Sequence, residues 1–295
     1  MKRVLDHDVI SSLKEFINHR ILDDLDGYRN ITTSLYPYSG SRRFSGKQIY
    51  SSPYSQWVYD SAITGAQIPS GVGSLSRGTS GLILDFKNGR VLVNSGTPIN
   101  DQIQVSIPDF NVYVTTTPFQ KLVLEGKFMY PPYLKPATEA GKSDALIAPC
   151  IVFSLMATTS QPFELGGVDS SNFLVQVGVL SDKMYHLMGV QKIIRESARR
   201  VFPLCSLTPL NEYNDLKEGY WNYDTVKDFA TSSQLLYISK TSFRIIDSDF
   251  INDKHPNLYM GIGTISISKF GAITDYDDFL PYSLGGDYSI YEFDE

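Results

Sequence analysis

The sequence predicts an α+β protein in which a small helix-on-sheet domain is interrupted by a β-rich module. Apolar residues at helical spacing open the chain, and short runs broken by Gly, Ser and Pro fill its middle. Longer apolar strands surround a second helix towards the end. We therefore expect a first core helix in residues 1–27, a β-rich insertion in 28–135, an α+β core in 143–270 and a C-terminal arm in 271–295.

The first helix is predicted by apolar residues that share one helical face. Asp6 or Asp8 is expected as its N-cap, because a carboxylate accepts hydrogen bonds from the free N–H groups of a first turn. Gly27 lies just past the expected end, where glycine commonly terminates a helix. The apolar positions are Val9, Leu13, Phe16, Ile17 and Ile21.

The β-rich part contains a strong hairpin signal, GLILDFKNGRVLVNSG, at residues 81–96. Asn88 and Gly89 tolerate positive φ, so we expect them at the two central positions of a type I′ turn. Both faces of the hairpin are apolar, which predicts that a second layer covers it. The core-facing set is Leu82, Leu84, Phe86, Val91 and Val93, and the opposite set is Ile83 and Leu92. Further strands are expected in 48–60, 102–107, 110–116 and 122–128.

The core domain is predicted to be a sheet with one helix in its middle. Residues 146–156 are apolar on both faces, as in a central strand, and residues 172–180 alternate between apolar and polar. Residues 235–246 and 258–270 read as two closing strands. The glycines in Gly261-Ile262-Gly263 are expected to accommodate a neighbour inside the last strand.

The core helix is expected over residues 183–202, with Ser181 and Asp182 as its N-cap signal and Pro203 as its stop. Its apolar face is Leu187, Val190, Ile194 and Ala198. Arg195, Arg199 and Arg200 fall near its C-terminus, where positive charge complements the helix dipole.

Composition excludes several classes of protein. The formal net charge of −6 argues against a dedicated nucleic-acid binder, which needs clustered Lys and Arg. The sequence predicts neither a signal peptide nor a membrane span, which indicates a soluble chain made in a reducing cytoplasm. Cys150 and Cys205 suggest no disulfide framework and no zinc site, and Cys150 is expected as a buried free thiol.

Catalytic motifs are not found, so no enzyme activity, cofactor or metal is expected. The chain has no phosphate loop, no HExxH array and no nucleophile elbow. A glycosidase-like pair of carboxylates leaves no local signature, and the strand carboxylates could in principle converge. We interpret them as solvent-facing charges. They are Asp85, Asp101, Asp109 and Glu125.

The order of elements resembles the small α+β domain of tail-terminator and related neck proteins of tailed bacteriophages. One helix is followed much later by the strand APCIVFS, the strand FLVQVGVLS, a helix with two arginines near its end and a final antiparallel pair. The middle block, with SGLILDFKNGRVLVNSG and DFNVYVTT, resembles virion structural proteins of large marine and cyanobacterial myophages. In that family, one N-terminal helix and one helix that follows a VQVxV strand pack on a single sheet, and the protomers close into a ring.

The resemblance implies a structural component of the virion at the head-to-tail neck, of the terminator or connector type. It implies a homomeric ring, hexameric by analogy, assembled in the host cytoplasm and contacting other neck, tail-tube or sheath proteins. DNA would pass such a ring without specific binding, and no membrane would be involved. The alternatives are a baseplate or fibre-attachment binding module, and a β-rich hydrolase.

Candidate interface residues come from three segments. The helix end supplies Arg195 and Arg199, and a Tyr- and Trp-rich segment supplies residues that would bury against a neighbouring subunit or stack on a glycan. The acidic, aromatic C-terminal arm would drape over a neighbour, the alternative being a disordered tail. The aromatic candidates are Tyr213, Tyr220, Trp221, Tyr223, Tyr276, Phe279, Tyr282, Tyr288 and Tyr291.

Overall fold

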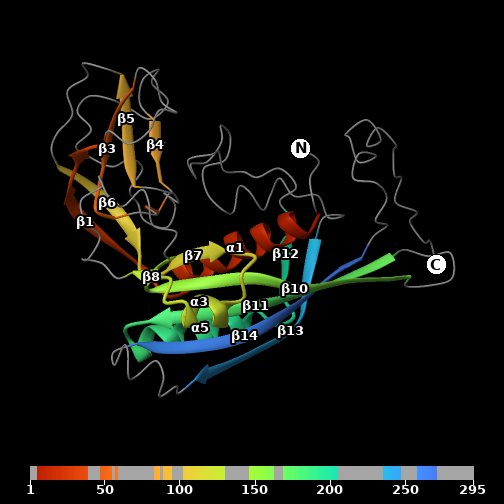
Figure 1. Ribbon diagram of the computed structural model, residues 1–295. Helices are drawn as coiled ribbons and strands as arrows, with labels where there is room; N and C mark the ends of the chain where they lie inside the picture. Colours follow the sequence, from red (N-terminus) through yellow and green to blue (C-terminus); the bar gives the residue numbers. More distant parts are fainter. Residues whose placement is uncertain are drawn as a thin grey trace, which may run out of the picture.

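The structure is a computed structural model of the 295-residue chain. The described residues are 5–38, 47–54, 57–58, 83–86, 89–94, 102–129, 146–162, 169–204, 235–246 and 258–270. Two bodies are visible in them, a large curved sheet with helices and a smaller β-rich lobe (Figure 1).

The large sheet has six strands in the order β12-β13-β14-β11-β10-β7. All neighbours are antiparallel except β7 and β10, which run parallel. The strands predicted at 172–180, 235–246 and 258–270 are confirmed as elements of this sheet. The predicted strand 146–156 is divided in two: β10 belongs to this sheet, whereas residues 146–147 form β9 in a separate two-stranded sheet. The bounds are β7 Asn111–Val114, β10 Cys150–Pro162, β11 Asp169–Ser181, β12 Val201–Pro203, β13 Leu235–Ile246 and β14 Tyr259–Phe270.

Helices α1 (Leu5–Asp24) and α5 (Met184–Glu196) pack on one face of this sheet and share its main hydrophobic core. The expected apolar face of α1 is confirmed, because all five of its predicted positions are buried there. Phe16 stacks on Phe202 of β12 with ring centroids 5.1 Å apart, which ties α1 to the edge of the sheet.

The ends of both helices differ from the prediction. Asp6 and Asp8 lie inside the first turn of α1, where their charge favours the helix dipole, and neither precedes the helix. At the other end Asp26 takes the left-handed conformation with φ of 48°. Helix α5 starts after Lys183, while Ser181 bonds to the backbone of Lys183 as a turn before it.

Helix α5 also ends earlier than predicted, at Glu196. Arg199 has φ of 64°, which breaks the helical path, and its N–H donates to the carbonyl of Ile238 at 2.8 Å. The chain from Val201 to Pro203 is strand β12. Arg199 and Arg200 therefore lie beyond the helix, and only Arg195 is in its last turn.

The opposite face of the sheet carries α3 (Phe119–Leu124), where the sequence had predicted a strand at 122–128. Phe119 packs against Gly178 of β11, and its N–H donates to the side-chain oxygen of Gln176 at 3.1 Å. These contacts with distant residues, rather than local pattern, hold the helix. Beyond α3, β8 (Phe128–Met129) pairs in parallel with β9 (Leu146–Ile147).

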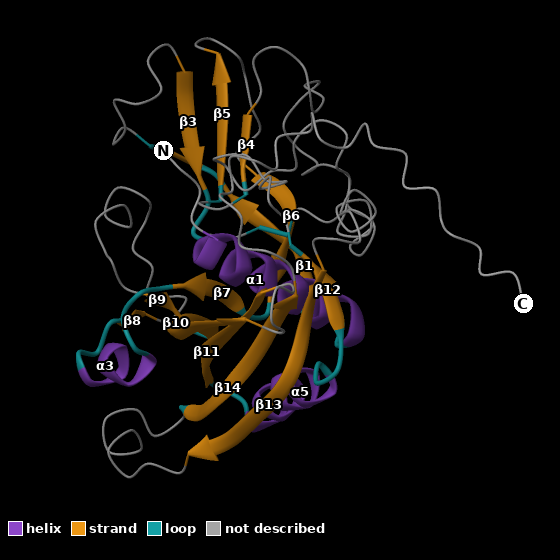
Figure 2. Ribbon diagram, turned by 90° about the vertical axis from the view of Figure 1, so that its right-hand side faces the viewer, coloured by secondary structure: helices purple, strands orange, loops and turns teal. Residues whose placement is uncertain are grey.

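The β-rich lobe stands away from the large sheet (Figures 1 and 2). It combines a four-stranded sheet in the order β2-β3-β5-β4 with the antiparallel pair β1-β6 around one core, which includes Leu84, Phe86, Val91 and Val93. The bounds are β1 Tyr28–Ser34, β2 Tyr36–Pro37, β3 Lys47–Ser51, β4 Ile83–Asp85, β5 Arg90–Asn94 and β6 Gln102–Pro108.

The hairpin of this lobe is confirmed, but its register differs from the predicted type I′ turn. Asp85 pairs with Arg90, so residues 86–89 connect the strands, whereas a turn centred on Asn88-Gly89 would pair Lys87 with Arg90. Gly89 has φ of 61°, its carbonyl accepts the N–H of Ser52 at 2.9 Å, and a Cβ there would overlap the carbonyl of Tyr54. Close approach of the segment after β3 thus explains the glycine.

The second face of the hairpin is also covered, as its apolar pattern predicted. Leu92 is fully buried and Ile49, its partner on β3, is 6% exposed. Neither belongs to the three core clusters that the described residues form. Asp85 on the same hairpin is buried at 2% exposure, so the interpretation of this carboxylate as solvent-facing was wrong.

The fold is therefore mixed α and β with strands predominating, and its helices lie on both faces of the large sheet. Strand β7, within the predicted insertion 28–135, belongs to the large sheet rather than to the lobe. Gly261 and Gly263 accommodate Phe243 of β13, as expected for interior strand glycines. None of the helices in the described ranges is long and apolar enough to span a membrane.

Candidate functional site

Two adjoining hollows lie where α1, the β6–β7 turn and the N-terminal half of α5 meet. The N–H of Gly27 donates to the carbonyl of Ile21 at 3.1 Å, and the N–H of Asp109 donates to the carbonyl of Gly27 at 2.8 Å. A Cβ at Gly27 would collide with the Ile21 carbonyl, so a glycine is needed at this crossing. The joint between lobe and sheet is thus held by backbone contacts.

The larger hollow is an apolar groove of about 410 Å³ between the end of α1 and the start of α5. Leu25 and Phe110 are among its apolar lining residues, and Lys192 also lines it. Two of its lining residues project into solvent, Tyr185 at 82% exposure and Met188 at 54%. Solvated apolar side chains beside an apolar hollow are typical of a surface that binds another chain.

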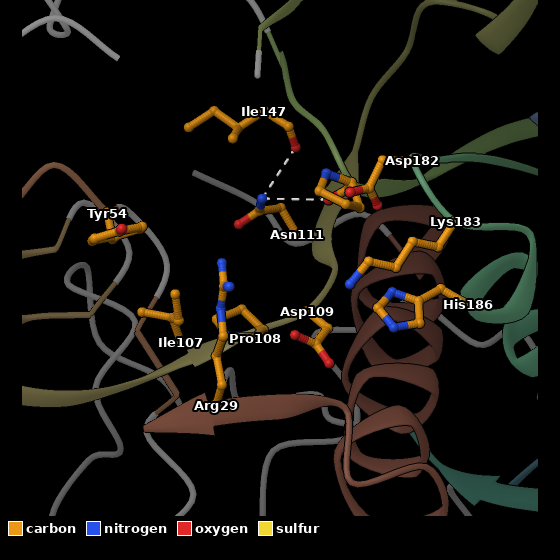
Figure 3. A pocket seen from close by; sticks show the side chains of 11 residues that line it. Arg29, Tyr54, Ile107, Pro108, Asp109, Asn111, Ile147, Asp182, Lys183 and His186 are labelled. Carbon is orange, nitrogen blue, oxygen red and sulfur yellow. Dashed lines mark hydrogen bonds between the residues drawn. The ribbon is translucent and has the colours of Figure 1, made fainter. Parts of the chain in front are cut away.

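The smaller hollow is a polar pocket of about 100 Å³ lined by Arg29, Asn111 and Lys183 among others (Figure 3). The side-chain amide of Asn111 has a structural role, since it donates to the carbonyls of Ile147 at 3.1 Å and Pro149 at 3.4 Å. At roughly 30 Å³ of liquid volume per water, the pocket holds only a few water molecules. It is too small for a typical organic substrate.

Asp109 and His186 line both hollows and so join them into one surface. In Figure 3 the side chains of Asp109, Lys183 and His186 extend towards a common space. The Nδ1 atom of His186 is buried without a hydrogen-bond partner in the described part of the chain, and its ring lies 5.9 Å from that of Phe110. The joined surface therefore grades from apolar to charged.

The carboxylates considered for catalysis do not gather at this site. Asp109 lines the pocket, but Asp85 lies on β4 and Glu125 follows α3, and neither lines either hollow. A hydrogen bond from Lys127, 3.0 Å away, holds the pKa of the Glu125 carboxyl below its usual value, as in a surface ion pair. Asp101 lies outside the described residues.

No cluster of His, Cys, Asp and Glu suited to a metal occurs among the described residues. Cys150 is buried and unpaired, as predicted, and burial raises the pKa of its thiol well above the usual range. Such a thiol is a poor nucleophile.

Of the predicted interface residues, the structure describes Arg195 and Arg199. Both are exposed, and neither lines a hollow. The groove is lined on α5 by residues from Tyr185 to Lys192 and so ends about one helical turn before Arg195, and neither arginine contributes to it. The aromatic candidates lie outside the described residues: Tyr213, Tyr220, Trp221, Tyr223, Tyr276, Phe279, Tyr282, Tyr288 and Tyr291.

A third hollow lies on the other face of the sheet, beside α3. It has a volume of about 320 Å³ and is lined by Met156, Gln176, Arg244 and Thr264 among others. Met156 is 55% exposed, close to the value for Met188, and lies on the opposite face of the sheet from α5. Met156 is therefore a matched control position for substitutions of Met188 in the groove.

Searches of protein-family models and of curated proteins find no match to this chain.

Proposed function

We propose that this chain is a non-catalytic structural protein of a tailed-bacteriophage virion, a neck component of the terminator or connector type that assembles into a homomeric ring. The proposed phage context rests on the resemblance in element order. Two features of the fold are compatible with it. Helices α1 and α5 share one face of a single sheet, and the strands of the β-rich lobe lie, in the sequence, between α1 and the first strand of that sheet.

The observation that carries the proposal is the apolar groove with Tyr185 and Met188 exposed above it. A monomer leaves these side chains in water, whereas a subunit contact buries them at roughly 25 cal/mol per Å² of apolar surface. A groove on one side of a protomer needs a different, complementary surface on the next, and such head-to-tail contacts form a ring when the rotation between neighbours closes.

The charge of the chain is compatible with a conduit for DNA. At a formal net charge of −6, the protein as a whole repels phosphate, so DNA in the ring would pass without being held. The proposed partners are other copies of the chain and the neck, tail-tube or sheath proteins next to it in the virion.

The test is the mass of the assembled protein by native mass spectrometry, with negative-stain electron microscopy of the same sample. We expect a discrete ring, hexameric on the analogy, and a weaker assembly for Met188→Glu than for the control Met156→Glu. A strictly monomeric chain at tens of micromolar, even with the tail-tube protein present, would contradict the proposal. A trimer would favour the baseplate or fibre-attachment alternative.

A further inference from the structure

We infer that the apolar groove on one copy receives the acidic, aromatic segment 271–295 of a neighbouring copy. The inference rests on the proposed homo-oligomer, and it identifies what fills the groove. The segment lies outside the described residues, so its chemistry is taken from its sequence. It contains seven Asp or Glu, six aromatic residues and no Lys or Arg.

The apolar half of the fit concerns shape and burial. A groove of about 410 Å³ accommodates one or two large side chains, and an aromatic residue buries roughly 150–250 Å² with few rotamers lost. Leu25 and Phe110 line the groove, while Tyr185 and Met188 extend beyond it, so an inserted ring would contact apolar atoms on several sides. A polar segment could not use this surface.

The charged half of the fit concerns the border of the joined hollows. Together they are lined by three cations, Arg29, Lys183 and Lys192, and two carboxylates, Asp109 and Asp182. Lys192 has Glu196 at 3.9 Å, but both side chains are largely exposed, so this pair is weak and is readily exchanged. An acidic segment with aromatic anchors suits such a border better than a basic one.

The segment is also long enough to reach another copy. It starts after Phe270, which pairs with Ser170 at the tip of the β10–β11 hairpin. The groove lies at the other end of the sheet, where Phe110 precedes β7 and Asn111 pairs with Cys150. Strand β10 has 13 residues and so spans about 40 Å, while 25 residues extend to roughly 80 Å. A segment of 25 residues is therefore long enough to reach beyond its own sheet.

The test uses the full chain with a photo-crosslinking phenylalanine analogue at Tyr185, whose exposure makes the replacement mild. We expect the main cross-link to fall within residues 271–295. Mixing isotope-labelled and unlabelled protein before irradiation should place the two cross-linked peptides in different copies. The same analogue at Met156, on the other face of the sheet, should not capture this segment.

A second measurement separates binding from folding. Replacing Phe279 and Tyr282 by serine in the full chain should reduce the Tyr185 cross-link at least fivefold without lowering the melting temperature. A cross-link from Tyr185 to any other region would overturn the inference, and one confined to a single copy would overturn exchange between copies. A ring seen by microscopy together with either result leaves the proposed function intact, whereas absence of any oligomer contradicts the proposed function itself.

Discussion

Arg20 connects the two helices that cover the large sheet, and its replacement tests whether this connection stabilises the fold. Its side chain is 11% exposed. The guanidinium donates to the carbonyl of Ile193 at 3.3 Å and to the hydroxyl of Ser197 at 3.0 Å, and so caps the C-terminus of α5. It also pairs with Asp24 at 2.6 Å and lies 3.6 Å from Glu196.

The substitution Arg20→Met keeps the apolar stem and removes the charge. Hydrogen bonds to charged groups contribute about 1.5–3 kcal/mol each, but several factors favour the lower end. Ser197 still donates to Ile193 at 2.7 Å, and water can solvate Asp24 and Glu196, which are 40% and 47% exposed. We expect a loss of about 2 kcal/mol in the free energy of unfolding.

At about 2–4 °C per kcal/mol for a chain of this size, the melting temperature should fall by about 4–8 °C, measured by circular dichroism. The control is Arg195→Met, since Arg195 is an exposed arginine in the last turn of α5. Its effect should stay within about 0.5 kcal/mol, as for ordinary surface substitutions. Equal melting temperatures for the two variants would refute the reasoning that Arg20 holds α1 to α5.

Two further predictions concern the face of the sheet that α3 covers. Gly178→Ala should cost about 1–3 kcal/mol by overpacking, because a Cβ there overlaps the Phe119 ring, and combining it with Phe119→Leu should recover part of the loss. Simple additivity in the double-mutant cycle, measured by urea unfolding, would count against this contact. Burial raises the pKa of Cys150, so the stability from its neutral thiol is present below the unfolded pKa of about 8.5 and is lost as pH rises above it. The free energies of unfolding at pH 7.5 and pH 10 should therefore differ less in Cys150→Ala than in the parent. An equal difference in the two proteins would contradict the prediction.

The elements that were predicted correctly are those in which the apolar pattern runs along most of the element. Residues 172–180 alternate because one side of β11 faces the helices and the other faces α3, so the strand was readable from its own residues. The apolar positions of α1 were readable for the same reason. Interior glycines at 261 and 263 also signalled a close neighbour, which the structure identifies as Phe243.

The predictions were wrong where contacts between residues far apart in the sequence determine the local structure. The segment after Pro118 has strand-forming residues, but Phe119 and Leu122 are buried one helical turn apart against β10 and β11. No local pattern shows that Gly178 leaves space for a ring there. The predicted hairpin register was wrong for the same reason, because contacts with the Ser52–Tyr54 segment, and not the turn alone, require a glycine at position 89.

The groove was missed although α5 contained a signal for it. The predicted buried face of that helix is confirmed at Leu187, Val190 and Ile194, which are fully buried. Tyr185 and Met188 are large apolar residues outside that face, where a helix exposed to solvent usually carries polar residues. The proposed contact with another chain would explain their presence, but the place of such a contact could not be predicted from α5 alone. Leu25 and Phe110, which complete the groove, come from segments that meet α5 only in the fold.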